Sequence, residues 1–191
     1  MEKFLSVYCE RAGVAGLWAE PVNALTNAAF LVSAVLILRE LFRPPALSPL
    51  RQWDIATLAA IVFMIGLGSA AWHMWPIRAT LLADVIPITL FIHGFIAAFM
   101  VRVMGLSLTW ALVIVGLYVA ATFSVPSLLS PRALEGTAAY LPAYTALALT
   151  TAVMFWLKTP QRWTMLLAIA LWTPSLTLRS IDGAVCTQFP L

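Results

Sequence analysis

Six apolar runs, each about twenty residues long, constrain this chain more than any other feature of its sequence. They cover residues 22–42, 54–72, 80–103, 106–125, 136–157 and 163–178. A helix of about twenty apolar residues spans the hydrocarbon core of a bilayer, and proline and charge fill the breaks between these runs. The sequence therefore predicts an all-α fold, a polytopic transmembrane bundle in which residues 1–191 form a single integral membrane domain.

Composition supports a membrane environment over a soluble helical bundle. Of the 191 residues, 62% are hydrophobic and 10% are charged, and a soluble domain of this size could not hide so much apolar surface. The basic residues are scattered at the ends of the apolar runs, where they suit lipid headgroups. We therefore expect a membrane lipid as the partner and no nucleic acid.

The termini and the two cysteines bear on orientation. Six crossings place both termini on one side, and Lys and Arg are slightly more numerous on the other, which favours an outside amino terminus. Cys9 and Cys186 both fall on the terminal side. They could form a disulfide in an oxidising compartment, or remain two free thiols.

Three polar residues lie where the second and third runs meet. Ser69 and His73 are four residues apart, so they share a helix face, and Asp84 follows about one turn into the next helix. Ionisable groups in a bilayer usually face the bundle interior and serve a function. Alternatively, Ser69 bonds to its own helix, His73 lies at the interface and Asp84 pairs with Arg78. His93, nine residues beyond Asp84, is interpreted as a helix-packing histidine.

The segment before the first run carries two carboxylates. Glu10 and Glu20 are oxygen ligands of the kind that calcium prefers, but Glu20 could instead cap the helix that begins near Pro21. Asn23 and Asn27 are four residues apart and predict a polar stripe that faces another helix.

Taken together, these strings resemble the alkaline ceramidases, within a superfamily of membrane hydrolases that includes the adiponectin receptors and the GPI-remodelling proteins. The likeness covers essentially the whole chain, and its first part is similar to the bacterial branch, which implies a bacterial inner membrane. The matching residues are Cys9-Glu10, Glu20-Pro21-Val22-Asn23-Ala24-Leu25-Thr26-Asn27, Gly66-Leu67-Gly68-Ser69, His73, Asp84, Pro87, Arg179-Ser180-Ile181-Asp182 and Cys186.

The resemblance implies seven helices and an intramembrane zinc ion held by three histidines. His73 matches one ligand, and the other two belong to a seventh helix that would begin after Leu191. Asp84 would be the general base or orient the zinc-bound water, and Ser69 would help to stabilise the oxyanion. We expect this chain alone to bind zinc weakly, because one histidine and one carboxylate make a poor site.

The resemblance also assigns supporting residues. Cys9 and Cys186 match the family's disulfide, and Arg179 and Asp182, like Asn23 and Asn27, would be structural polar residues. A calcium ion near the amino terminus is possible through Glu10 and Glu20, although Val7 and Ala12 stand where the family has oxygen side chains.

The predicted function is that of a zinc-dependent intramembrane amidase. It would hydrolyse ceramide-like lipids to a long-chain base and a fatty acid, provided that the missing histidines are supplied. The alternatives are an esterase or acyl hydrolase of the same superfamily, and a non-catalytic membrane protein that binds a lipid in the same pocket.

Overall fold

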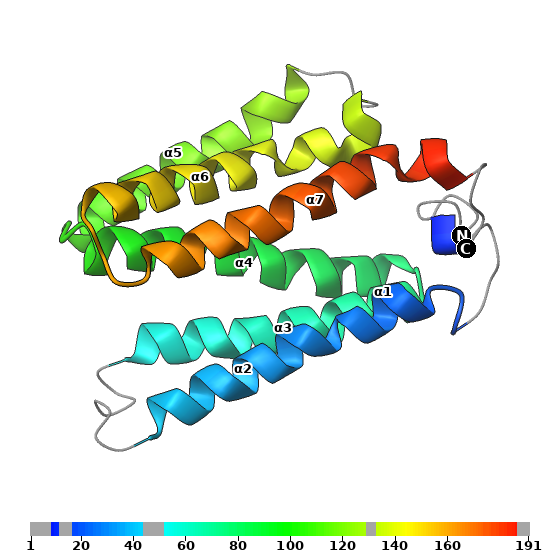
Figure 1. Cartoon of the computed structure of the whole chain (residues 1–191), viewed down its shortest axis with the longest axis horizontal. Coiled ribbons are helices and arrows are strands. Elements are labelled where there is room, and N and C mark those ends of the chain that lie inside the picture. Colours follow the sequence, from blue (N-terminus) through cyan, green and yellow to red (C-terminus); the bar gives the residue numbers. More distant parts are fainter. Residues whose placement is uncertain (1–8, 12–16, 44–51, 129–132, 187–191) are drawn as a thin grey trace. The chain divides into compact units, whose positions relative to one another are not determined.

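A computed structural model describes the chain except for residues 1–8, 12–16, 44–51, 129–132 and 187–191 (Figure 1). Most of the described residues are helical and none of them is in a strand, which confirms the all-α prediction. They form two compact units. The amino-terminal unit runs to Ala98 and the carboxy-terminal unit from Phe99 to Pro190, so each unit is described by itself.

The amino-terminal unit consists of a short 3-10 turn, two helices that form one span, and a helical hairpin. In chain order these are η2 (Cys9–Arg11), α1 (Pro21–Thr26), α2 (Ala28–Leu41), α3 (Trp53–Met74) and α4 (Arg78–Arg102), the last of which ends in the second unit. Asn27 alone separates α1 from α2, and its backbone is helical, so the two are nearly continuous. Helices α2 and α3 lie side by side (Figure 1).

Two glycines allow α3 to approach its neighbours closely. A Cβ atom at Gly66 would lie 2.8 Å from Cδ2 of Leu31 in α2, and one at Gly68 would lie 1.9 Å from the carbonyl oxygen of Ala83 in α4. Membrane helices pack closely where small residues let their backbones meet. The α3–α4 hairpin is therefore closed at Gly68, next to Ser69.

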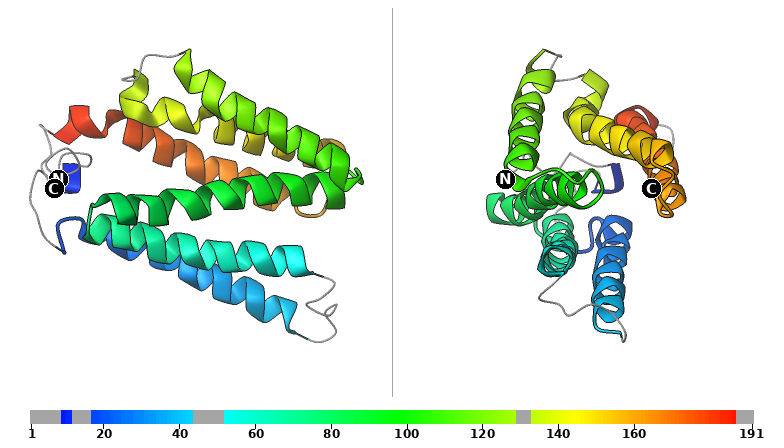
Figure 2. Two further views of the ribbon diagram at one scale, coloured as in Figure 1. Left: turned by 180° about the vertical axis from the view of Figure 1, so that it is seen from behind. Right: turned by 90° about the vertical axis from the view of Figure 1, so that its left-hand side faces the viewer.

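The carboxy-terminal unit contains α5 (Leu108–Ser127), the 3-10 segment η4 (Ala133–Tyr140), α6 (Leu141–Trp156) and α7 (Arg162–Cys186). Helices α6 and α7 lie side by side (Figure 2). The hydroxyls of Tyr144 and Thr173, 2.9 Å apart, join them by a hydrogen bond. Near the α6–α7 turn, the rings of Phe155 and Trp163 make an edge contact with their centroids 5.1 Å apart.

Two helices extend past the approximate ends that the apolar runs predict. The sixth helix was predicted to end at residue 178, but α7 continues to Cys186 and so includes Arg179 and Asp182. The fourth run was predicted to end at residue 125, but α5 continues through Pro126 to Ser127. Charge and proline set where an apolar run ends, whereas a helix only needs its backbone hydrogen bonds to continue, and it can do so into the interface.

The distribution of side chains fits an integral membrane protein. Five described helical spans are long and apolar enough to cross a bilayer, whereas the apolar stretch found in α5, Leu108–Ser124, is shorter. Large apolar side chains are exposed along the helices, while several polar side chains are buried. Exposed tryptophans mark helix ends, as expected at the two headgroup layers; they are Trp18, Trp53, Trp75, Trp110, Trp156 and Trp163.

The close approach at Gly68 gives a first prediction. The substitution Gly68→Ala should destabilise the protein by about 1–3 kcal/mol, because the new methyl group would force α3 and α4 apart. Gly116→Ala in α5 is the matched control, since a Cβ there meets nothing within 4 Å. Thermal unfolding in detergent measures both variants, and equal midpoints for the two would contradict the packing argument.

Candidate functional site

Ser69, His73 and Asp84 come together at one end of the α3–α4 hairpin. Ser69 and His73 are on α3 and are both buried, with 9% of each residue exposed. The Ser69 hydroxyl hydrogen-bonds to the Asp84 carboxylate of α4, and His73 is close enough to interact with the same carboxylate electrostatically. We call these three residues the polar triad. Among the described ion pairs none joins Asp84 to Arg78, so that alternative fails.

The polar triad has features that fit a bound cation. Oδ1 of Asp84 is buried and has no hydrogen-bond partner among the described residues, so it can still accept a proton or bind a cation. Imidazole nitrogen and carboxylate oxygen are both ligands for zinc. No group of three His, Cys, Asp or Glu side chains that could hold a metal occurs in the described ranges, so the triad would supply only part of a zinc site.

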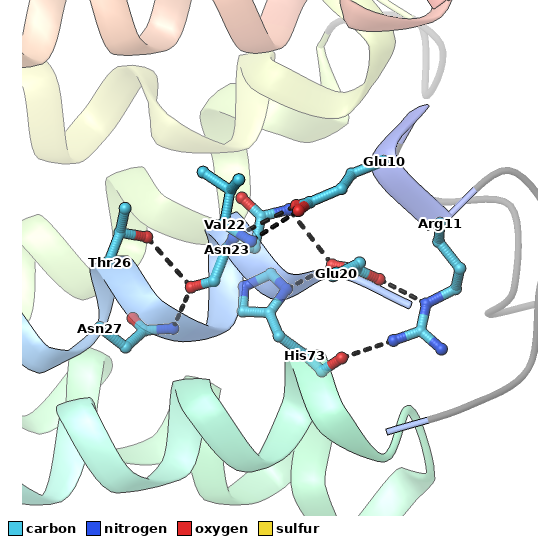
Figure 3. Close-up of polar contacts among 8 residues, drawn as sticks. All are labelled: Glu10, Arg11, Glu20, Val22, Asn23, Thr26, Asn27 and His73. Atoms are coloured by element: carbon cyan, nitrogen blue, oxygen red, sulfur yellow. Dashed lines mark hydrogen bonds and ion pairs between the residues drawn. The ribbon is translucent and has the colours of Figure 1, made fainter. Parts of the chain in front are cut away.

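A second cluster joins the amino-terminal turn to the end of α3. Nε of Arg11 donates to Oε1 of Glu20, and Nη2 of Arg11 donates to the backbone carbonyl of His73 over 2.6 Å (Figure 3). Nδ1 of His73 lies 2.5 Å from Oε2 of Glu20, and the Asn23 amide donates to the same oxygen over 3.2 Å. We call Arg11, Glu20, Asn23 and His73 the amino-terminal clamp.

The clamp holds a charged carboxylate out of water. Only 3% of Glu20 and 1% of Arg11 are exposed. Burial by itself would raise the pKa of Glu20, but the hydrogen bonds and positive charges of His73 and Arg11 outweigh it, so that the pKa falls below its ordinary value of 4.5. Glu20 is therefore ionised at neutral pH and acts only as an acceptor.

The two glutamates have separate roles in the structure. Glu20 occupies the N-cap position of α1, but its side chain makes no capping hydrogen bond. Glu10 does so instead, since its carboxylate accepts the backbone N–H groups of Val22 over 2.6 Å and Asn23 over 3.1 Å (Figure 3). The prediction that Glu20 could cap the helix thus named the right interaction and the wrong carboxylate.

These contacts do not fit a calcium site made by the two glutamates. Calcium takes six to eight oxygen ligands, whereas the described oxygens of Glu10 and Glu20 face N–H donors of the backbone, Arg11, Asn23 and His73. Calcium at this position stays a prediction that the described contacts do not favour.

The remaining predicted residues make contacts of their own in the two units. In α4, Nδ1 of His93 donates to the carbonyl of Thr89 over 2.6 Å, one turn back in the same helix. The Asn27 amide is buried and donates to the carbonyl of Asn23 over 2.8 Å, so this stripe makes bonds within its own span. In the carboxy-terminal unit, the Arg179 guanidinium lies 5.5 Å from the centroid of the Tyr140 ring, and Asp182 is half-buried.

The predicted disulfide falls partly outside the described residues. No cysteine among the described residues carries a free thiol. The side chain of Cys186 is not described, so its pairing with Cys9 stays a prediction.

Comparison with family models, with curated proteins and with solved structures finds no match for this chain. The resemblance to the alkaline ceramidases therefore depends on the motifs of the sequence, and the family assignment stays a prediction. What the fold and the site define is a helical integral membrane protein with a buried polar centre.

The lowered pKa of Glu20 predicts how stability depends on pH. An ionised Glu20 stabilises the fold fully above its ordinary pKa of 4.5, and this contribution is lost as the pH falls through the lower folded value. At neutral pH, Glu20→Gln should cost about 3 kcal/mol, because it leaves the Arg11 charge buried and uncompensated. Below pH 4.5 the difference in stability between the variant and the wild type should become smaller.

Thermal unfolding in detergent across this pH range measures the effect. The control is Glu40→Gln, since Glu40 forms an exposed ion pair with Arg43 and should give curves like the wild type. A difference in unfolding temperature between Glu20→Gln and wild type that is the same at every pH would contradict the negative charge assigned to Glu20.

Proposed function

We propose that this protein is a zinc-dependent intramembrane amidase that hydrolyses ceramide-like lipids to a long-chain base and a fatty acid. The observation that carries the proposal is the meeting of Ser69, His73 and Asp84 at one end of the α3–α4 hairpin. Burying a hydroxyl, an imidazole and a carboxylate in a membrane span is costly. Such groups usually serve a function there.

Each residue of the triad has a role that its chemistry allows. His73 would be one zinc ligand, and the metal, when bound, would lower the pKa of a water molecule and polarise the amide carbonyl. Asp84, whose Oδ1 still has acceptor capacity, would take the proton from that water. The Ser69 hydroxyl, which donates to Asp84 in the free protein, would turn to donate to the oxyanion.

The depth of the triad supports a lipid substrate. Spans Trp53–Met74 and Arg78–Arg102 are apolar, and the triad lies within two or three turns of their connected ends. A lipid with its chains in the bilayer and its amide just below the headgroups would reach that depth. An ester lipid would reach it as well, so the assay must compare amide and ester lipids with matched chains.

The test is release of fatty acid from labelled ceramide by the protein expressed from its gene, with zinc present. His73→Ala should lower the rate more than about 100-fold, because even residues that only support a metal ligand cost 10–100-fold. His93→Ala is the matched control and should keep the rate, since His93 bonds within its own helix. Stoichiometric lipid binding without turnover of either lipid would instead favour the non-catalytic lipid-binding protein.

We also propose the Cys9–Cys186 disulfide and an amino terminus outside the cell. A non-reducing digest should yield the two cysteine peptides linked, and Cys9→Ala should lower stability by about 2–4 kcal/mol, as for the loss of other native disulfides. Reduction should lower the wild-type unfolding temperature and leave that of the variant unchanged. Two separate peptides from oxidised protein would refute the pairing and with it this argument for orientation.

A further inference from the structure

The imidazole of His73 has its two nitrogens in different surroundings. Nδ1 lies 2.5 Å from Oε2 of Glu20. An ionised carboxylate can only accept a hydrogen bond, so Nδ1 must carry the proton and donate it. In the neutral ring the lone pair is then on Nε2, so a metal or substrate that binds this ring would bind it through Nε2.

Glu20 is itself held in place from several sides. Arg11 donates to its Oε1, and Asn23 donates to its Oε2 over 3.2 Å. Arg11 also donates to the backbone carbonyl of His73, so the contacts form a closed loop from the guanidinium through Glu20 and the imidazole back to the same guanidinium (Figure 3). A closed loop of buried hydrogen bonds restricts the position of each member more than one bond would.

Arg11 supplies the positive charge that this carboxylate needs. Its guanidinium is charged at every accessible pH and presents donors in a fixed planar arrangement. One of its nitrogens pairs with Glu20 and another with the carbonyl at the end of α3, where a helix terminus favours a cation. The clamp therefore needs no bound ion to balance Glu20.

We propose that Glu20 is a positioning residue that fixes His73 in the tautomer with the proton on Nδ1, so that Nε2 is its ligating nitrogen, and that Arg11 holds Glu20 in place. The identity of the ligand that Nε2 receives rests on the proposed function, whereas the tautomer does not. Histidines that bind metals generally donate their other N–H to a carboxylate or carbonyl in this way, and the partner raises the basicity of the ligand.

The experiment is nitrogen-15 NMR of histidine-labelled protein in detergent at alkaline pH, where an ordinary imidazole is neutral. The chain has two histidines, so His93→Ala assigns the two rings. In the wild type, His73 should show a protonated Nδ1 and an unprotonated Nε2. Any other state of the wild-type ring overturns the proposal without need of a variant.

Glu20→Gln tests the cause of the tautomer. The Gln carbonyl oxygen would accept from Arg11, so its NH₂ group would face Nδ1 of His73 and donate to it. The proton of His73 should therefore move to Nε2, the nitrogen needed as a ligand. His93, which donates from Nδ1 to the carbonyl of Thr89, should keep its tautomer and so report that the helix is intact.

The comparison with hydrolysis separates this proposal from the proposed function. Glu20→Gln should lower kcat/KM for labelled ceramide by about 10–100-fold, the range found for partners of metal-binding histidines. A change of tautomer in a protein that hydrolyses no lipid would support the positioning role and sink the amidase. Hydrolysis by the wild type, together with an unchanged His73 tautomer in Glu20→Gln, would support the amidase and overturn the positioning role.

Discussion

The Glu20 carboxylate connects the amino-terminal turn and the start of α1 to His73 of α3, which lies 53 residues further along the chain. It binds Arg11 of the 3-10 turn, Asn23 of α1 and His73 of α3. A buried charge is costly unless it is paired and hydrogen-bonded, so the carboxylate, the guanidinium and the imidazole stabilise one another only when all are present. The position of the turn against the end of α3 depends on this interaction.

Helices could be predicted from the sequence because hydropathy is a direct consequence of the solvent. In a bilayer every backbone N–H and C=O must be bonded within the chain, so a run such as 54–72 can hardly be anything but a helix, and it lies within α3. Helix ends were harder. The helix predicted to end at residue 178 continues to Cys186, since helical hydrogen bonds persist where the apolar composition stops.

The polar triad could be predicted because local geometry brings it together. Residues four apart share a helix face, and a short turn returns Asp84 to the end of α3 from which Ser69 and His73 project. The arrangement of the clamp could not be foreseen. Glu10 and Glu20 have the same chemistry, and only the folded turn decides that Glu10 caps α1 while Glu20 pairs with Arg11. The sequence did contain one signal for a buried ion pair. A basic residue, Arg11, directly follows one of the two carboxylates, Glu10.

A guanidinium in this position has a consequence for how the site is controlled. A bound divalent ion exchanges with solution, so a clamp that depended on one would respond to ion concentration. Arg11 is covalently part of the chain, so the charge that balances Glu20 cannot dissociate from the site. The protonation of Glu20 can vary, but the pKa of this carboxyl is lowered. Glu20 therefore loses its charge only in acid. At neutral pH the orientation of His73 is thus a fixed property of the fold, which suits the positioning role that we propose for Glu20.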